Sequence, residues 1–82
     1  MTKPINQNIF QTPDLGCAAG LISAGFTLKD LNRSNPKKIQ FYFVHEAGIE
    51  EASADYFADR LQVNSRTYFD NVRNLKNLIH AA

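Results

Sequence analysis

The chain has 82 residues, of which 44% are hydrophobic and 21% are charged, and its formal net charge is only +1. This length suits a single domain with a modest core, and the composition is that of a globular protein. The small net charge excludes a uniformly basic nucleic-acid-binding protein, and the longest apolar run, residues 15–26, is too short to span a bilayer. The single cysteine, Cys17, has no partner for an internal disulfide, so we expect a reducing, cytoplasmic setting.

The first predicted elements are a loose N-terminal segment, a short strand and a helix. Residues 1–8 are polar and are expected to be loose, and residues 9–10 could begin a short edge strand. Thr12 is a favourable N-cap, the proline after it suits the first helical position, and Gly25 is a typical residue just beyond a helix. We therefore predict a first helix over residues 13–24.

Small residues recur along one side of this helix. Gly16, Gly20 and Ala24 are spaced every four residues, so a neighbouring backbone could approach this side closely, although glycine lowers helix propensity. We expect the domain's own sheet to pack against these residues, with the partner chain of a homodimer as the alternative.

A β-hairpin with a basic tip is predicted next. Residues 26–31 and 39–45 are suited to strands, and the sequence SNPKK between them is rich in turn-forming residues. In the second stretch, Ile39, Phe41 and Phe43 alternate with more polar neighbours and are expected to face inward.

Two further helices are predicted after a break at Gly48. The second helix is expected over residues 49–61, where apolar residues that include Phe57 form a broad stripe. Asn64 or Ser65 is a suitable N-cap for a third helix. The buried face of this third helix is expected to contain Tyr68, Val72, Leu75 and Ile79.

These elements predict one α+β domain over residues 1–82, in which an antiparallel hairpin, with or without an N-terminal edge strand, packs with three helices. The core between the strand and the third helix is expected to contain Phe41, Phe43, Val72 and Leu75. The serines lack a nucleophile-elbow motif, the glycines form no phosphate-binding loop, and the cysteine and two histidines lack zinc-site spacing. We therefore expect a protein that is not an enzyme, without catalytic residues, metal or cofactor.

Residues 57–75, FADRLQVNSRTYFDNVRNL, resemble the helix-turn-helix of many bacterial regulators, with Ala58, Leu61 and Val63 at its small, apolar and turn positions. The resemblance implies that the second helix of the motif enters the major groove through Asn64, Ser65, Arg66, Phe69, Asp70 and Arg73. The motif usually has glycine where this chain has glutamine, and a bulky phenylalanine and an acid on the groove face oppose DNA binding. The alternative interpretation is a pair of ordinary core helices, with Phe69 buried.

A second resemblance rests on features spread over almost the whole chain, namely Thr12, Asp14-Leu15, Gly25-Phe26, Ile39-Phe41-Phe43, Val63, Tyr68-Phe69 and Leu75-Lys76. In these features the chain is similar to a family of small, uncharacterised domains found in phages, prophages and plasmids. The resemblance implies a mobile-element setting and a compact unit that acts by binding, and it implies no particular activity.

The charged residues are segregated along the chain in the order basic, acidic, basic. The two basic regions favour a non-enzymatic accessory protein of a phage or other mobile element that associates with nucleic acid. Its phosphate contacts are expected to come from Arg33, Lys37, Lys38, Arg66, Arg73 and Lys76. This interpretation requires the hairpin and the third helix to lie on one face of the molecule.

Two other functions remain open from the sequence. The acidic second helix could bind a basic surface of a host protein, as an inhibitor or modulator, through Glu50, Glu51, Asp55 and Asp59. The chain could instead be a module that assembles with copies of itself, such as a homodimer. No membrane partner is expected.

Overall fold

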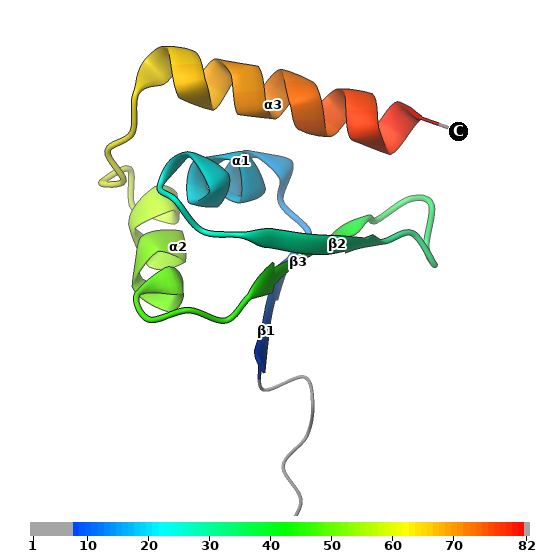
Figure 1. The fold of residues 1–82 in the computed structure, drawn as a ribbon, viewed down its shortest axis with the longest axis horizontal. Helices are drawn as coiled ribbons and strands as arrows, with labels where there is room; N and C mark the ends of the chain where they lie inside the picture. The colour runs from blue at the N-terminus through cyan, green and yellow to red at the C-terminus, as the bar shows by residue number, and fades with distance from the viewer. Residues whose placement is uncertain (1–7, 82) are drawn as a thin grey trace, which may run out of the picture.

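The computed structural model describes residues 8–81, in which three helices and a three-stranded antiparallel sheet form an α+β unit (Figure 1). Along the chain these elements are β1 Ile9–Thr12, α1 Leu15–Ser23, β2 Leu28–Asn32, β3 Gln40–Val44, α2 Ile49–Phe57 and α3 Ser65–His80. The predicted fold class is confirmed, and the N-terminal edge strand is present as β1. The loose segment expected at residues 1–8 lies outside the described residues, apart from Asn8.

The strand β3 lies at the centre of the sheet, with β2 on one side and β1 on the other. Phe10 lies opposite Phe43 and Thr12 lies opposite Phe41, so these four side chains share one face of the sheet. Phe41 and Phe43 are 1% and 0% exposed, because the central strand has neighbours on both sides and helices above it. The predicted inward face of this strand is therefore confirmed.

Helix α1 begins later than predicted because its N-cap is Asp14 and not Thr12. The Asp14 carboxylate accepts a hydrogen bond from the Cys17 backbone N–H at 2.8 Å, which satisfies one of the free donors of the first turn. Thr12 is instead the last residue of β1, and its hydroxyl oxygen accepts a hydrogen bond from the Asp14 N–H. The predicted N-cap thus ends the strand that precedes the helix.

The glycine side of α1 packs against two tyrosines and a leucine and not against the sheet. A Cβ atom added at Gly16 would overlap the Tyr56 hydroxyl, and one added at Gly20 would lie 3.0 Å from Leu61 Cδ2. The Tyr68 hydroxyl donates a hydrogen bond to the Gly16 carbonyl at 3.2 Å. The expectation that the sheet covers these glycines is therefore wrong: α1 lies between the sheet and α3, and its glycine side faces the other helices (Figure 1).

Helix α2 ends at Phe57, before the predicted end of residues 49–61. Asp59 adopts a left-handed φ of 62°, which stops the helix. The backbone N–H groups of Arg60 and Leu61 then both donate to the Asp55 carbonyl. Phe57 is 62% exposed, so its predicted place in a buried stripe is wrong.

Helix α3 lies along α1 and buries the face that its sequence predicts. Leu75 is 3% exposed, and Tyr68, Val72 and Ile79 are partly buried against the same core, which also holds the two phenylalanines of β3. Helix α1 contributes its fully buried Cys17, Ala18, Ala19 and Leu21 to this core. The C-terminal end of α3 extends beyond α1, above the β2–β3 hairpin (Figure 1).

Candidate nucleic-acid interface

The predicted helix-turn-helix geometry is not formed. Seven residues, 58–64, separate the end of α2 from the start of α3, whereas the turn of that motif has three or four residues. The left-handed Asp59 ends α2 early, and α3 then packs along α1. The segment 57–75 therefore contains the last residue of α2, the seven-residue connection and the first part of α3, whose Tyr68, Val72 and Leu75 pack on the core.

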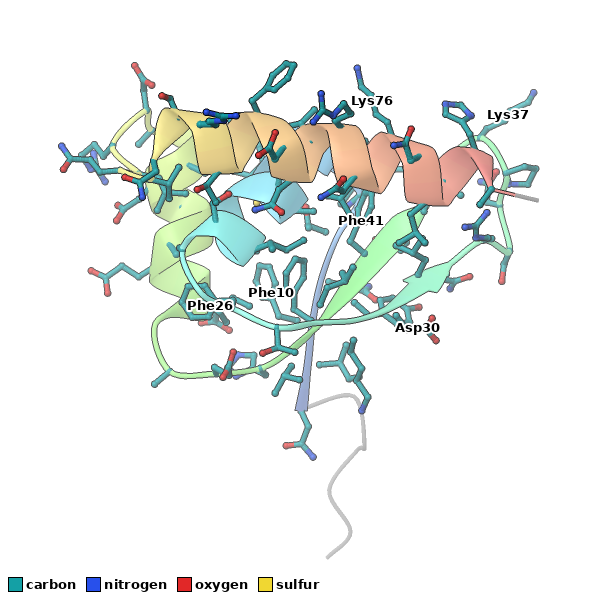
Figure 2. All side chains as sticks on the ribbon, turned by 45° about the horizontal axis from the view of Figure 1, so that its top comes forward. Phe10, Phe26, Asp30, Lys37, Phe41 and Lys76 are labelled. Atoms are coloured by element: carbon teal, nitrogen blue, oxygen red, sulfur yellow. The ribbon has the colours of Figure 1, made fainter. Side chains whose placement is uncertain are left out.

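Basic residues form a row along one exposed flank of α3. The row contains four basic residues and one phenylalanine, separated alternately by three and four residues, so they follow one side of the helix. All five are exposed: Arg66, Phe69, Arg73, Lys76 and His80. Figure 2 shows Lys76 projecting away from the body of the molecule. We call these five residues the α3 basic row.

The one acid of α3, Asp70, lies beside this row. Its carboxylate accepts a hydrogen bond from the Arg73 guanidinium at 3.2 Å, and both side chains are substantially exposed. An exposed pair of this kind stabilises the fold by about 1 kcal/mol or less. Its larger effect is to reduce the positive charge that Arg73 offers to a polyanion, so Arg66 and Lys76 are the stronger candidates for phosphate contacts.

Phe69 stands in the middle of the α3 basic row and not in the core. The alternative interpretation of the sequence placed it in the core beside a tyrosine, and this is wrong, since 61% of Phe69 is exposed. Tyr68 and Leu75 already occupy the side of α3 that faces the core, and Phe69 is turned about 100° away from Tyr68. The Arg73 guanidinium lies 5.4 Å from the centre of the Phe69 ring, within the range of a cation–π contact.

Arg33 joins the hairpin to the C-terminal end of α3. Its guanidinium donates hydrogen bonds to the backbone carbonyls of Leu78, Ile79 and Ala81, with the Ile79 bond at 3.0 Å. These carbonyls lie in the last turn of α3 and beyond it, where a cation is also favoured by the helix dipole. Arg33 was predicted to contact phosphate, but in this structure it holds two elements together.

The Arg33 contacts bring the basic tip of the hairpin next to the α3 basic row. Lys37 and Lys38 are both exposed in the turn between β2 and β3, and Figure 2 shows Lys37 near the C-terminal end of α3. Arg66 lies near the other end of the helix, about 21 Å away from His80 at 1.5 Å per residue. The predicted basic residues thus follow one elongated path from the start of α3 to the hairpin tip.

The predicted acidic residues lie on a different part of the molecule. Helix α2, which carries Glu50, Glu51 and Asp55, is at the end of the molecule opposite the hairpin tip (Figure 1). Glu50 lies 3.0 Å from the His45 imidazole, and Asp55 lies 3.3 Å from the Arg60 guanidinium. The net charge is therefore close to zero although the acids of α2 and the cations of the hairpin tip lie at opposite ends of the molecule.

A tyrosine-lined pocket of about 810 Å³, which was not predicted from the sequence, lies beside the start of α3. Tyr56, Leu61, Asn64 and Tyr68 contribute to its wall. A hydrogen bond with the Tyr68 hydroxyl, together with burial, raises the pKa of Tyr56 to about 12. The signal in the sequence was the pair of glycines in α1, which leaves room for these two rings.

Cys17 is a buried thiol in the core of the molecule. Its sulfur lies 3.4 Å from the Ser53 hydroxyl oxygen, and burial is the main cause that raises the pKa of the thiol. A raised pKa keeps the sulfur protonated and unreactive at neutral pH.

Residues 8–81 contain neither a membrane-spanning helix nor a cluster of metal ligands. No helix in this part of the chain has the length and apolar character needed to cross a bilayer. No three His, Cys, Asp or Glu side chains in it come together in a way that could hold a metal ion.

Comparison with known proteins identifies the family of the chain. Residues 7–81 match the family described as Domain of unknown function (DUF5659). The chain belongs to this family. No curated protein and no solved structure matches the chain.

Proposed function

We propose that the protein is a non-enzymatic accessory protein of a phage or other mobile element that binds nucleic acid through the α3 basic row and the hairpin tip. The observation that carries the proposal is the Arg33 contact, which brings Lys37 and Lys38 to the end of a helix flank already lined by basic residues. A cytoplasmic setting is part of the same proposal and is supported by the single, buried thiol.

Local charge, and not net charge, decides such binding. Screening limits electrostatic interactions to about 8 Å at physiological salt, so the acids of α2 have little effect on the cations of the hairpin tip, which lies at the opposite end of the molecule. Lysines and arginines that contact phosphates release condensed counterions, which supplies most of non-specific affinity. With only a few free cations on the path, we expect dissociation constants of roughly 1 to 100 μM at physiological salt.

The test is a fluorescence-anisotropy titration of labelled duplex and single-stranded DNA at two salt concentrations. Arg66→Ala or Lys76→Ala should weaken binding and lower the slope of log affinity against log salt by about one unit, because each removes one phosphate contact. Lys29→Ala is the matched control, since Lys29 is exposed on β2 and lines a pocket with Leu78, which lies on the side of α3 opposite the row.

Folded protein that gives no signal with either DNA at low salt would end the proposal. An equal loss for Lys29→Ala and Lys76→Ala would also contradict it, because binding would then depend on total charge and not on the α3 basic row.

A host-protein inhibitor or modulator is the second candidate function. It is favoured by Phe57, a 62% exposed phenylalanine at the end of the acidic helix α2. Charge reversal at Glu51 and Asp59, which are both exposed, should then abolish biological activity while Arg66→Ala and Lys76→Ala behave as wild type. Self-association, the third function that the sequence left open, predicts a sedimentation coefficient that rises with protein concentration.

A further inference from the structure

We infer that the α3 basic row binds single-stranded nucleic acid in preference to duplex, with Phe69 as the surface on which an unpaired base stacks. The inference rests on the proposed function, because it assumes that the row binds nucleic acid, and it adds the strandedness of the ligand and a residue that recognises it. The residues that carry it are Arg66, Phe69, Arg73 and Lys76.

The fold does not require a phenylalanine at position 69. The ring is 61% exposed, and the core-facing side of α3 is complete without it. An exposed apolar ring is unfavourable in water unless something covers it, and no described element does so. We therefore infer that Phe69 contacts a ligand that binds the outer flank of α3.

Cations flank the ring in both directions along the helix. Arg66 precedes Phe69 by three residues, Arg73 follows by four and Lys76 by seven, so each lies within two turns on the same flank. Alternation of aromatic and basic side chains is the pattern of surfaces that bind single strands without sequence preference, where bases stack and phosphates pair with cations. A protein partner with an apolar surface would not favour this surrounding of positive charge.

The Arg73 contact leaves room for a base. The guanidinium lies 5.4 Å from the ring centre, over one side of Phe69, and the side chain still exposes more than half of its surface. This exposed part of the ring is large enough for a planar base to stack on it. A guanidinium can itself stack on a base, so Arg73 and Phe69 together suit two neighbouring nucleotides.

A duplex makes poor use of this surface. Its bases are paired and stacked on one another, so Phe69 could reach a base face only by wedging into a step and unstacking it. If α3 instead entered the major groove, Asp70 would approach the phosphates together with the row. In a single strand the bases turn outward from the backbone without that cost, and phosphates can follow Arg66, Lys76 and the hairpin tip.

The experiment uses the full chain and fluorescently labelled oligothymidine, oligouridine and a DNA duplex, each of about twelve nucleotides or base pairs, in anisotropy titrations at equal salt. The variant is Phe69→Leu, which keeps an apolar side chain but removes the aromatic ring. The matched control is Phe57→Leu, because Phe57 is 62% exposed, as Phe69 is, but belongs to α2 and not to the row. Thermal melts verify that both variants remain folded.

We expect wild-type protein to bind oligothymidine or oligouridine more tightly than the duplex. Phe69→Leu should weaken single-strand binding about 5- to 100-fold and duplex binding by less than about twofold, since only the single strand loses a stacking contact. Phe57→Leu should bind as wild type. A preference between the two oligonucleotides assigns the ligand to DNA or RNA and supports the inference in either case.

Three results separate failure of this inference from failure of the proposed function. Tighter binding of the duplex than of both single strands would overturn the inference and leave the nucleic-acid proposal standing. Equal single-strand affinity of wild type and Phe69→Leu would do the same. No binding of any of the three probes at low salt would overturn both.

Discussion

Helices α1 and α3 lie side by side but are constrained in opposite ways (Figure 1). In α1 four residues are 0% exposed, namely Cys17, Ala18, Ala19 and Leu21. The two glycines of α1 lie on another side of the helix and pack against two tyrosines. In α3 only Leu75 is fully buried, and its outer flank carries the α3 basic row. A ligand can therefore be bound on α3 more readily than on α1, because residues 17–21 of α1 are buried whereas α3 packs with one side and leaves the other exposed.

The largest expected contrast is between Leu21 in α1 and Leu78 in α3. Leu21→Ala removes a fully buried side chain and should lower the free energy of unfolding by about 2–5 kcal/mol. Leu78 is 43% exposed, so Leu78→Ala should change the free energy of unfolding by about 0.5 kcal/mol or less. Urea denaturation midpoints measure both variants, and similar midpoints would contradict the comparison.

Gly16→Ala tests how closely α1 is packed. Alanine gains about 0.5–1 kcal/mol of helix propensity, but its Cβ would overlap the Tyr56 hydroxyl and lie 3.1 Å from Tyr56 Cζ. A tyrosine ring moves less easily than the end of an aliphatic chain, so we expect a net loss of about 1–2 kcal/mol in the free energy of unfolding. The double variant with Tyr56→Phe lacks the hydroxyl and should recover part of this loss; no recovery would place the conflict elsewhere.

The same tyrosine predicts a loss of stability at high pH. Its pKa rises from an ordinary value of 10.0 to about 12 in the folded protein, through the hydrogen bond with Tyr68 and burial. The unfolded chain therefore loses this proton first, so the contribution is complete below pH 10 and disappears as the pH rises from 10 to 12. The pKa difference sets an upper limit of about 2.7 kcal/mol, which partial exposure of the ring reduces.

Urea midpoints of wild type and Tyr56→Phe at pH values below and above this range measure the effect. Lysines also titrate there, so the quantity of interest is the difference between the two proteins. Wild type should lose more stability than Tyr56→Phe between the two conditions, and equal losses would refute the assigned pKa.

Much of the fold followed from local patterns. The alternation in β3 and the helical spacing in α3 each predicted the buried face, because one side of each element packs on the core. Predictions failed where tertiary contacts decide the outcome. The partner of Gly16 depends on how α2 and α3 pack. Phe57 is exposed because α2 turns the side with Ile49, Ala52 and Tyr56 toward the core.

The candidate site was predictable in its residues but not in its geometry. The sequence identified the basic residues of the hairpin and of α3, and the structure brings them to one elongated path. The sequence left the position of Phe69 open between an outer face shared with Arg66 and Arg73 and a place in the core, because an apolar residue in a helix is usually buried. Its spacing from Arg66 and Arg73 was the available signal, since all three fall on one helical flank.

Arg33 is a basic residue of the hairpin that packs on α3, and its replacement is expected to have only a small effect on stability. Its guanidinium donates to three backbone carbonyls at the end of α3 from the far side of a hairpin. Arg33→Lys keeps the charge but loses the planar fork that reaches several carbonyls at once. We expect it to lower the free energy of unfolding by about 0.5–1 kcal/mol, because the contacts are exposed to water.

The matched variant is Lys38→Ala in the same hairpin. Lys38 is exposed in the turn, so this substitution should leave the urea midpoint unchanged and lower the salt dependence of nucleic-acid binding by about one unit. Arg33→Lys should do the reverse, lowering the urea midpoint while leaving the salt dependence close to that of wild type. If Arg33→Lys instead left the urea midpoint unchanged, the joint between the hairpin and α3 would depend on other residues.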